Sequence, residues 1–478
     1  MNVKSNLKTI KYIKRIADLS IKRKTKVWLV GGFLRDKILK REKELVDVDF
    51  CVEKRTLPFV KELSKLLSSK YIVLDDKQQS YRIFVKDKAK VYTYDFTAIR
   101  GKDIIEDLSK RDFTINSIAV DINDKRFTLL DPYQGALDLS RGVLRSVSED
   151  VFLDDPLRVL RAFSFKANYG FKIKTTTEKA IVKYKVFLKD VSGERIREEI
   201  FKIFSTSTCY KTVKEMDRLA VLDEIFPEIK KCRKVVQGDY HHLDVWDHSL
   251  ETLRQFERLC KEQIETNSEV SDHLSGSSKM VVSKITLLRL ACLFHDIGKP
   301  VAKKETEKKT IFHMHEKIGR DIAEKICERL RFSVREREFL KKCVYWHLRP
   351  GYLADQKTLS KRAVYRFFRD TDVDGVAVIL LSLADWRATR GPLINYRKRK
   401  RHERVMLGLV DFYLSEKKKK PLPKLVNGDD IMHRFKLDQG KLVGRILEKI
   451  TEEQNVGRIR NKTEAYALAK RVIKSLND

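Results

Sequence analysis

The pattern of hydrophobic and polar positions changes near residue 150. Before that point, short apolar or alternating runs predict strands, and amphipathic stretches between them predict helices. After it, apolar residues recur every three or four positions and few strands are indicated. The pattern predicts an α+β protein with N-terminal strands and a helical remainder. The predicted strands are 26–30, 47–53, 81–87 and 90–99, and the predicted helices are 5–22, 33–41, 57–67, 155–171, 177–188 and 194–204.

The charge balance favours a polyanionic partner. The chain of 478 residues has 101 Lys and Arg against 68 Asp and Glu, a net charge of +33. The alternative is a solvated, lysine-rich surface without such a partner. No apolar run approaches the roughly 20 residues of a membrane span, and the N-terminus shows no secretory signal. The seven cysteines form no CxxC pair, which argues against a zinc ribbon or disulfide framework and indicates a cytoplasmic protein.

The first candidate site combines a glycine turn with three carboxylates. Gly31 and Gly32 directly follow a predicted strand, where backbone N–H groups can approach phosphate oxygens, although such a turn is often only a turn. Asp47 and Asp49 are two residues apart on a strand, so their carboxylates face the same side. With Asp95 on a further strand, they predict a two-Mg²⁺ site for phosphoryl transfer. The alternative is a set of solvent-facing acids on an edge strand.

Three sequence blocks resemble class II tRNA nucleotidyltransferases and poly(A) polymerases. They are VWLVGGFLRDKIL…VDVDF, EDLSKRDFTINSIAVDI and DDPLRVLRAFSFKANYGF, in the family's order, within residues 25–205. The resemblance implies a nucleotidyltransferase head that contains a mixed sheet and uses Mg²⁺. It assigns the triphosphate to Gly31, Gly32, Arg35 and Asp36, the metals to Asp47 and Asp49 with Asp95 as a third candidate, and the ribose 2′-hydroxyl to Arg111 and Asp112.

The block at 154–158 resembles the family's EDxxR motif, which reads the edge of the incoming base. Here Asp154 replaces the glutamate, followed by Asp155 and Arg158. A carboxylate accepts from an exocyclic amine and a guanidinium donates to ring nitrogens, so C and A both fit while U and G do not. Arg161 lies on the same helical face as Arg158, and the alternative is that both bind RNA phosphates. The shorter Asp154 leaves open whether it touches the base.

The second candidate site is a set of histidines and aspartates on separate helical segments. Imidazole and carboxylate together suit Mn²⁺, Ni²⁺, Co²⁺, Fe²⁺ or Zn²⁺, with Mg²⁺ as a further candidate. The series resembles the HD phosphohydrolase superfamily, which implies hydrolysis of phosphate esters by a metal-bound hydroxide. The alternative is an HD fold retained as an RNA-binding scaffold. The predicted ligands are His248, His295, Asp296, His315, His347 and Asp385, while His241, His242 and His313 receive no role.

These resemblances predict four domains. Residues 425–471 resemble the tail of bacterial tRNA nucleotidyltransferases, and the basic clusters 397–404 and 417–420 are expected to meet tRNA phosphates. The alternative for 417–420 is a solvated loop. Residues 265–279 are polar and Ser-rich and predict a loop between two helices. The domains are a head (1–140), a helical neck for base selection (141–225), an HD domain (226–400) and a helical tail for tRNA (401–478).

The predicted function is addition of nucleotides to the 3′ end of tRNA from CTP and ATP. Alternatives are a full CCA-adding enzyme, a poly(A) polymerase, and an HD phosphohydrolase with an RNA-binding head. The interval between TAIR and EDLSKRDFT is filled only by residues 101–105, where CCA-adding relatives carry a longer flexible loop. This difference from the family predicts an enzyme that adds CC only. The sequence predicts no oligomeric state.

Overall fold

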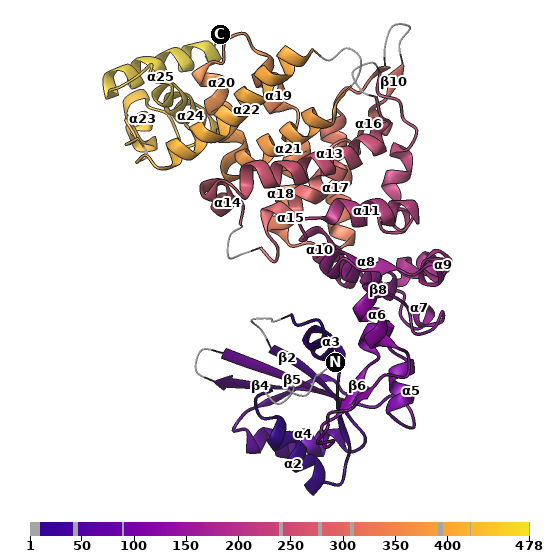
Figure 1. Ribbon diagram of the computed structural model, residues 1–478. Coiled ribbons are helices and arrows are strands. Elements are labelled where there is room, and N and C mark those ends of the chain that lie inside the picture. Colours follow the sequence, from indigo (N-terminus) through magenta and orange to yellow (C-terminus); the bar gives the residue numbers. More distant parts are fainter. Residues whose placement is uncertain are drawn as a thin grey trace. The chain divides into compact units, whose positions relative to one another are not determined.

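The predicted change from a sheet to helices is present in the computed structural model (Figure 1). The chain divides into two compact units, residues 1–225 and 226–478. The first unit holds the sheet and several helices. The regular elements of the second unit's described residues are helices apart from one short hairpin, so the predicted α+β class is confirmed. The structure describes residues 10–41, 46–87, 90–238, 242–275, 280–305, 310–390, 395–420 and 422–477.

Seven strands of the described residues form a mixed sheet in the order β3-β4-β5-β2-β1-β6-β7. The parallel pair β2–β5 lies at its centre, and the other neighbours are antiparallel. All of β1 is buried, as expected for a continuous apolar run covered on both faces. The strands are β1 (Val27–Val30), β2 (Val46–Val52), β3 (Tyr71–Asp75), β4 (Ser80–Asp87), β5 (Lys90–Ala98), β6 (Ala119–Asp121) and β7 (Leu129–Leu130).

Three of the described helices of the predicted head lie before strand β3 in the chain. Helix α3 (Gly31–Ile38) follows β1 without a loop, α4 (Thr56–Leu66) packs on β3, β4 and β5, and α2 (Ile13–Lys22) packs on α4. Phe50 and Phe96 stack at 5.0 Å between ring centroids, and Phe59 of α4 packs on Phe96. These contacts fix the central strands, on which the candidate site lies. Residues 5–9 of the predicted first helix lie outside the described residues.

The remainder of the first unit is mainly helical. Helix α8 packs against α10 and α11 through apolar faces. Strands β8 (Val143–Leu144) and β9 (Lys172–Ile173) form a small parallel pair. The other elements are α5 (Ile104–Ser109), η1 (Thr114–Asn116), α6 (Gly135–Arg141), α7 (Val151–Asp154), α8 (Arg158–Tyr169), α9 (Thr175–Tyr184), η2 (Lys185–Asp190), α10 (Gly193–Phe204), α11 (Cys209–Arg218) and α12 (Leu222–Ile225).

In the second unit, helices α13, α15, α18 and α21 pack around one another, with α17 against α18 and α22 against α21. The elements are η3 (Pro227–Cys232), α13 (Val245–Leu259), η4 (Cys260–Ile264), α14 (Ser268–Leu274), α15 (Lys284–Phe294), α16 (Lys299–Ala302), β10 (Lys304–Glu305), β11 (Thr310–Ile311), α17 (His315–Arg329), α18 (Val334–Trp346), α19 (Arg349–Asp355), α20 (Lys361–Thr371), η5 (Asp372–Asp374), α21 (Gly375–Ala388) and α22 (Tyr396–Lys417).

The C-terminal helices α23 (Gly428–Phe435), α24 (Lys441–Asn455) and α25 (Lys462–Asn477) have an apolar core of their own, centred on Ile431 and Ile446. In α24, Glu452 is buried and pairs with Arg362 and Arg366, which ties α24 to α20. Across the described part of the chain, no helix combines the length and the hydropathy that spanning a membrane requires.

The predicted loop at 265–279 is corrected by the structure. Residues 268–274 form helix α14, and residues 276–279 lie outside the described residues. The Asn267 side chain accepts hydrogen bonds from the N–H groups of Glu269 and Val270 and so begins the helix. Val270 and Leu274 are buried. A capping residue and two apolar positions are therefore enough for a helix in this polar stretch.

Candidate active site and candidate metal centre

The turn between β1 and α3 brings the backbone against a carboxylate of β2. Gly31 has φ +76°, and a Cβ there would lie 2.6 Å from Oδ2 of Asp49. The backbone of Gly32 donates a hydrogen bond to Asp49. Val30 and Asp49 are partners in the β1–β2 pair. Gly31 therefore allows the Asp49 carboxylate to lie at the beginning of α3, where N–H groups also favour phosphate oxygens.

Asp47, Asp49 and Asp95 share one face of the sheet. Asp47 and Asp49 are two residues apart on β2, and Asp49 is opposite Asp95 in the parallel pair β2–β5. Asp47 is exposed and Asp49 is half-buried. Burial and the nearby Asp95 carboxylate raise the pKa of Asp49 above its usual value. Acids that repel one another in this way suit a divalent cation between them.

Asp95 also has a cationic partner on the neighbouring strand. Arg82 donates from Nε to Oδ1 and from Nη2 to Oδ2 of Asp95, both at 2.7 Å. The two residues are cross-strand partners on β4 and β5. Both oxygens of Asp95 thus accept hydrogen bonds already, so Asp47 and Asp49 fit a metal better than Asp95 does. Its role as a third ligand stays a prediction.

A cavity of about 530 Å³ opens beside this turn. Its wall is rich in arginine, and most of these arginines have a carboxylate close by. Asp36 and Asp154 are not among its described lining residues. The polar residues of the wall include Arg35, Asp49, Arg100, Asp107, Arg111, Asp112, Asn116, Asp155, Arg158, Arg161 and Arg195.

Arg35 is held on three sides inside this wall. Its Nη1 donates to Asn116 Oδ1 at 2.9 Å, its Nε to Asp36 Oδ1 at 3.0 Å, and its Nη2 to the Tyr169 hydroxyl at 2.5 Å. The guanidinium also lies over the rings of Phe165 and Tyr169. Asp36 is buried, and Tyr169 donates to it at 2.8 Å. Arg35 thus faces the cavity, whereas Asp36 supports it from behind.

Arg111 shares one carboxylate with Arg100. Arg111 donates from Nε and Nη2 to Oδ2 of Asp107, and Arg100 donates from Nε to Oδ1. Burial would raise the pKa of Asp107, but Arg111 and Arg100 outweigh it and lower the pKa. The Cys51 thiol lies 3.2 Å from Arg111 Nη2, and burial raises its pKa to about 12. Asp107 therefore aims two cations at the cavity.

Asp112 fixes Arg161 in the same manner. Arg161 donates from Nε and Nη2 to Oδ2 of Asp112 at 2.9 and 2.7 Å. Asn116 and the N–H of Phe113 donate to Oδ1. Burial would raise the pKa of Asp112, but Arg161 and these hydrogen bonds lower it. Both oxygens of Asp112 are engaged, so the structure places it as a support for Arg161, and its contact with a ribose stays a prediction.

The two aspartates of the 154–158 block lie in different surroundings. Asp154 is exposed, 62% for its side chain, and stands 4.0 Å from Arg158. Asp155 lines the cavity and pairs with Arg195 at 2.8 Å. Arg158 donates to the backbone oxygens of Val151 and Lys110, and burial lowers its pKa. Asp155 and Arg158 are therefore the pair that faces the cavity.

Sequence reasoning missed several members of this wall. Arg100, Asp107 and Asn116 line the cavity but were given no role, Tyr169 contacts Arg35 from outside the wall, and Arg195 lies 40 residues from its partner Asp155. The one signal available was the spacing of Asp107 and Arg111, because residues four apart form an ion pair where the chain is helical. Arg82 could have been found as a cation on the strand facing Asp95.

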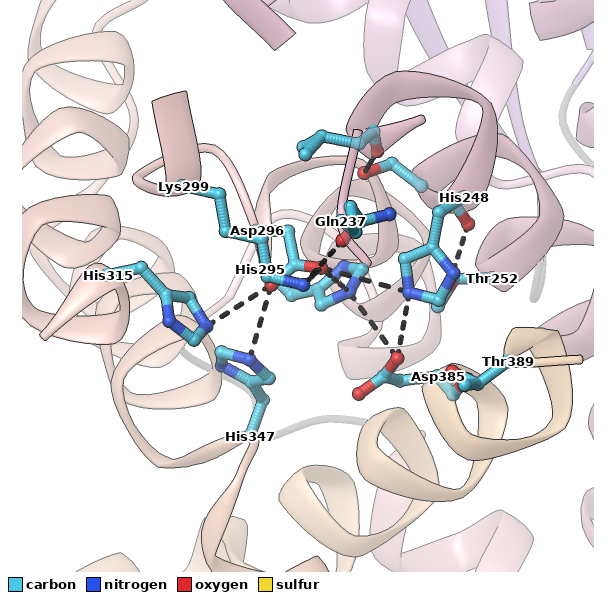
Figure 2. Close-up of polar contacts among 12 residues, drawn as sticks. Gln237, His248, Thr252, His295, Asp296, Lys299, His315, His347, Asp385 and Thr389 are labelled. Atoms are coloured by element: carbon cyan, nitrogen blue, oxygen red, sulfur yellow. Dashed lines mark hydrogen bonds and ion pairs between the residues drawn. The ribbon is translucent and has the colours of Figure 1, made fainter. Parts of the chain in front are cut away.

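The six predicted HD residues come together in the second unit (Figure 2). Asp296 lies at the centre, between His315 and His347 on one side and His248 with Asp385 on the other. Nε2 of His295 is 3.1 Å from Oδ2 of Asp296, whereas Nε2 of His315 and of His347 are 3.3 and 3.6 Å from Oδ1. The ligand atoms form two groups that share Asp296, one with His248 and His295, the other with His315 and His347.

Each of three imidazoles is oriented by a backbone carbonyl. Nδ1 of His295, His315 and His347 hydrogen-bonds the carbonyl of the residue three positions earlier, at 3.0, 2.8 and 2.7 Å. Their Nε2 atoms are buried and lack hydrogen-bond geometry with any described residue, although each lies 3.1 to 3.6 Å from the Asp296 carboxylate. A buried polar atom without a partner is costly. The donor set therefore fits a divalent metal, with Nδ1 fixing the tautomer.

Charges around the cluster keep its acids ionised. Burial would raise the pKa of Asp296, but His295 and Lys299 hold it well below its usual range. Lys299 is buried, lies 2.7 Å from Oδ2 of Asp296 and donates to Oε1 of Gln237 at 2.6 Å. Burial would raise the pKa of Asp385 as well, but the hydrogen bond with His248, at 2.8 Å, lowers it. Ionised carboxylates are the form that binds a metal.

Three further histidines had received no role. His242 and His313 are both exposed, and neither belongs to the two groups of ligand atoms. His241 lies outside the described residues.

Three family models match the chain. A "Poly A polymerase head domain" covers residues 27–145, a "Probable RNA and SrmB- binding site of polymerase A" covers 170–232, and an "HD domain" covers 245–389. Together they include the turn at Gly31, the three carboxylates and the histidine cluster. The block at 154–158 falls between the first two matches.

Relatives with curated names match most of the chain. An A-adding tRNA nucleotidyltransferase of Deinococcus radiodurans is 29% identical over 93% of this chain and 94% of its own length. A CC-adding tRNA nucleotidyltransferase of Thermus thermophilus is 29% identical over 92% of both. A multifunctional CCA protein of Shewanella frigidimarina is 31% identical over 64% of this chain and 70% of its own length.

Solved structures share the fold. A CCA-adding enzyme in complex with ATP has a TM-score of 0.68, with 22% identity over 98% of this chain and 96% of its own. A Thermotoga maritima CCA-adding enzyme with tRNA has a TM-score of 0.66 at the same identity and coverage.

Proposed function

Because the chain belongs to the family of class II tRNA nucleotidyltransferases and poly(A) polymerases, we propose that it adds nucleotides to the 3′ end of tRNA from CTP and ATP. The observation that carries the proposal is the arginine-walled cavity that opens directly onto Asp49 and the glycine turn. Triphosphates are bound by such a combination of cations and backbone N–H groups. The net charge of +33 suits a polyanionic acceptor.

The side chains of the cavity divide into two groups by what they can bind. Arg35, Arg100, Arg111 and Arg161 present guanidinium groups that suit phosphate oxygens and ribose hydroxyls. Asp155 and Arg158 present an acceptor next to donors, which matches the amine and ring nitrogen of C and A. U and G present the reverse order, a carbonyl and an N–H. A site that hydrogen-bonds one edge rejects the other because buried polar groups would be left unsatisfied.

Asp47 and Asp49 would hold Mg²⁺, which supplies charge for the leaving pyrophosphate and lowers the pKa of the attacking 3′-hydroxyl. The chain's own contribution is placement. The N–H groups at the beginning of α3 and Arg35 bind the triphosphate, so that its α-phosphate lies near Asp49. The 3′-hydroxyl gives up its proton to water and attacks the α-phosphorus, the bond to the bridging oxygen breaks, and pyrophosphate leaves.

The tRNA activity is tested with a tRNA transcript lacking its 3′-terminal CCA and each labelled nucleoside triphosphate. We expect C to be added first, and U and G to be rejected. Long adenosine tails on an unrelated RNA would instead favour a poly(A) polymerase. The relatives that cover over nine-tenths of the chain act on tRNA by name, which favours tRNA.

We further propose that addition stops after CC. Strand β5 ends at Ala98 and α5 begins at Ile104, and the connection is tightly fixed. Glu106 accepts from the N–H of Lys102 and pairs with Lys110, while the Asp103 side chain caps the N–H of Glu106. A short connection that is fixed in this way cannot serve as the flexible loop that would reorient Asp155 and Arg158 to accept ATP. Efficient addition of A to tRNA ending in CC, with ATP alone, would contradict this.

A second activity is favoured by the histidine cluster. We propose that it hydrolyses phosphate esters. His248, His295, Asp296 and Asp385 would hold one divalent ion, and Asp296, His315 and His347 would hold a second. A bound metal would supply a hydroxide at neutral pH. Lys299 is the cation placed to hold Asp296 ionised. The Nε2 atoms of His295, His315 and His347 support this proposal, because they are buried without a hydrogen bond from a described residue and a bound metal would satisfy their lone pairs.

The test is to add divalent metal to the chain and to measure hydrolysis of 2′,3′-cyclic nucleotides and of phosphate monoesters. Hydrolysis that depends on the added ion and on His295 supports the proposal. Retention of the ion without hydrolysis of any ester would favour a scaffold that binds RNA.

A further inference from the structure

The ion pair between Asp155 and Arg195 fixes the orientation of the Asp155 carboxylate, the proposed acceptor for the base. Oδ2 of Asp155 accepts from Arg195 Nη2 at 2.8 Å, and Oδ1 accepts from the N–H of Leu157 at 3.2 Å. A carboxylate offers about four lone-pair positions, so two remain for a ligand. Both Asp155 and Arg195 line the cavity. The direction of the remaining acceptors is therefore set from outside the 154–158 block.

A competing partner lies close to Asp155. Arg158 begins α8 three residues later, and the Asp155 charge acts on its pKa. A direct ion pair between them would satisfy the acceptor and the donors with each other and leave none for a base. Among the described residues, Asp155 instead forms its ion pair with Arg195. Arg158 is drawn to the carbonyl oxygens of Val151 and Lys110. Two sets of contacts therefore hold the acceptor and the donors apart.

We infer that Arg195 is a specificity-determining positioning residue. It holds Asp155 away from Arg158 and directs a free carboxylate lone pair toward the donor edge shared by C and A. This inference rests on the proposed nucleotidyl transfer and adds a residue outside the base-reading block to it. Arg195 comes from α10, so the discrimination depends on the packing of α10 against α8.

The experiment compares Arg195→Ala with a matched control, Arg218→Ala. Arg218 pairs with Glu178 at 2.7 Å, is 56% exposed against 51% for Arg195, and is not among the described residues of the cavity wall. The measured quantity is the ratio of kcat/KM for CTP to that for UTP on tRNA lacking CCA. We expect this ratio to fall by about tenfold in Arg195→Ala, a typical effect of one misplaced base contact. It should stay unchanged in Arg218→Ala and be partly retained in Arg195→Lys, which keeps one donor.

A double-mutant cycle separates positioning from a structural role. In an Asp155→Ala background, Arg195→Ala should not change the CTP/UTP ratio further, because the carboxylate it positions is gone. Thermal unfolding of each variant excludes loss of the fold. An equal loss of kcat/KM for CTP and UTP in Arg195→Ala, or the same fall of the ratio without Asp155, would overturn the inference. If the unaltered chain adds no nucleotide at all, the proposed function fails instead, so the two failures are distinguishable.

Discussion

The cavity of the first unit and the histidine cluster of the second differ in how their polar atoms are satisfied. In the cavity, Arg35, Arg111 and Arg161 each have a carboxylate partner, and Arg158 has two carbonyls. In the cluster, three Nε2 atoms are buried without a hydrogen bond from any described residue. The first site therefore keeps its shape without a ligand, whereas the second keeps donor atoms available for an ion. A nucleotide site needs ordered cations, and a metal site needs accessible lone pairs.

The largest effect is expected when the carboxylates of β2 are removed. Asp49→Ala or Asp47→Ala should lower nucleotide addition to below about 1% of the original rate, because a proposed metal ligand is lost. Affinity for tRNA and the metal content of the histidine cluster should persist. Asp121→Ala, on β6 of the same sheet, is the control. Addition above a few per cent in either variant would contradict the assignment.

The second test acts on the other site. His295→Ala combined with Asp296→Ala should abolish ester hydrolysis and metal retention and leave nucleotide addition within about twofold, since the two sites lie in separate units. His402 is a buried histidine outside the two ligand groups, and His402→Ala controls for loss of packing. Loss of both activities together would indicate that the cluster supports the fold of the whole chain.

The third test asks whether the cluster holds one ion or two. His315→Ala combined with His347→Ala should lower the bound metal from about two to about one per chain, as measured by elemental mass spectrometry. His248→Ala should affect the other group of ligands and leave the His315–His347 group able to bind. An unaltered chain that binds a single ion at saturation would contradict the two-ion arrangement.

The smallest expected effect concerns stability. The raised pKa of Asp49 means that its charged form is disfavoured in the folded chain, so stability falls as pH rises from the usual carboxyl pKa to the raised one and changes no further above it. In the presence of a metal chelator, Asp49→Asn should raise the midpoint of thermal unfolding at pH 7 by about 2 °C. For a unit of this size that corresponds to about 1 kcal/mol in the free energy of unfolding. The gain should vanish at acidic pH, where Asp49 is protonated. Asp47→Asn, at an exposed position, should change little.

Strands with strong local patterns were predicted from the sequence, whereas β3 and the short strands β6 and β7 were not. Strands β1, β2, β4 and β5 correspond to apolar or alternating runs. Strand β3 (Tyr71–Asp75) lies at the edge of the sheet, and its three consecutive apolar residues Ile72, Val73 and Leu74 are exposed. It was missed because its sequence lacks the alternation of apolar and polar residues that marks a half-buried strand. Sequence gives no register either, so the opposition of Asp49 and Asp95 became visible only in the β2–β5 pair.

The candidate sites show the same division. The histidines and aspartates of the cluster carry strong local patterns, above all His295-Asp296, and could be named from the sequence. Arg195 and Tyr169 could not, because their roles depend on contacts with Asp155 and Arg35 that are set by helix packing. The supporting roles of Asp36 and Asp112 were hidden for the same reason. Spacing predicts which groups share a face and does not predict which of them already have a partner.

The close approach of Gly31 to Asp49 has a consequence for the evolution of this fold. Any side chain at position 31 would have to adopt φ +76° and place its Cβ 2.6 Å from a carboxylate oxygen. Replacement of Gly31 would therefore require a shift of the Asp49 carboxylate as well as a left-handed backbone conformation, so the two positions are expected to vary together. Loss of Asp49 would remove only the first obstacle, because the positive φ at position 31 belongs to the turn itself.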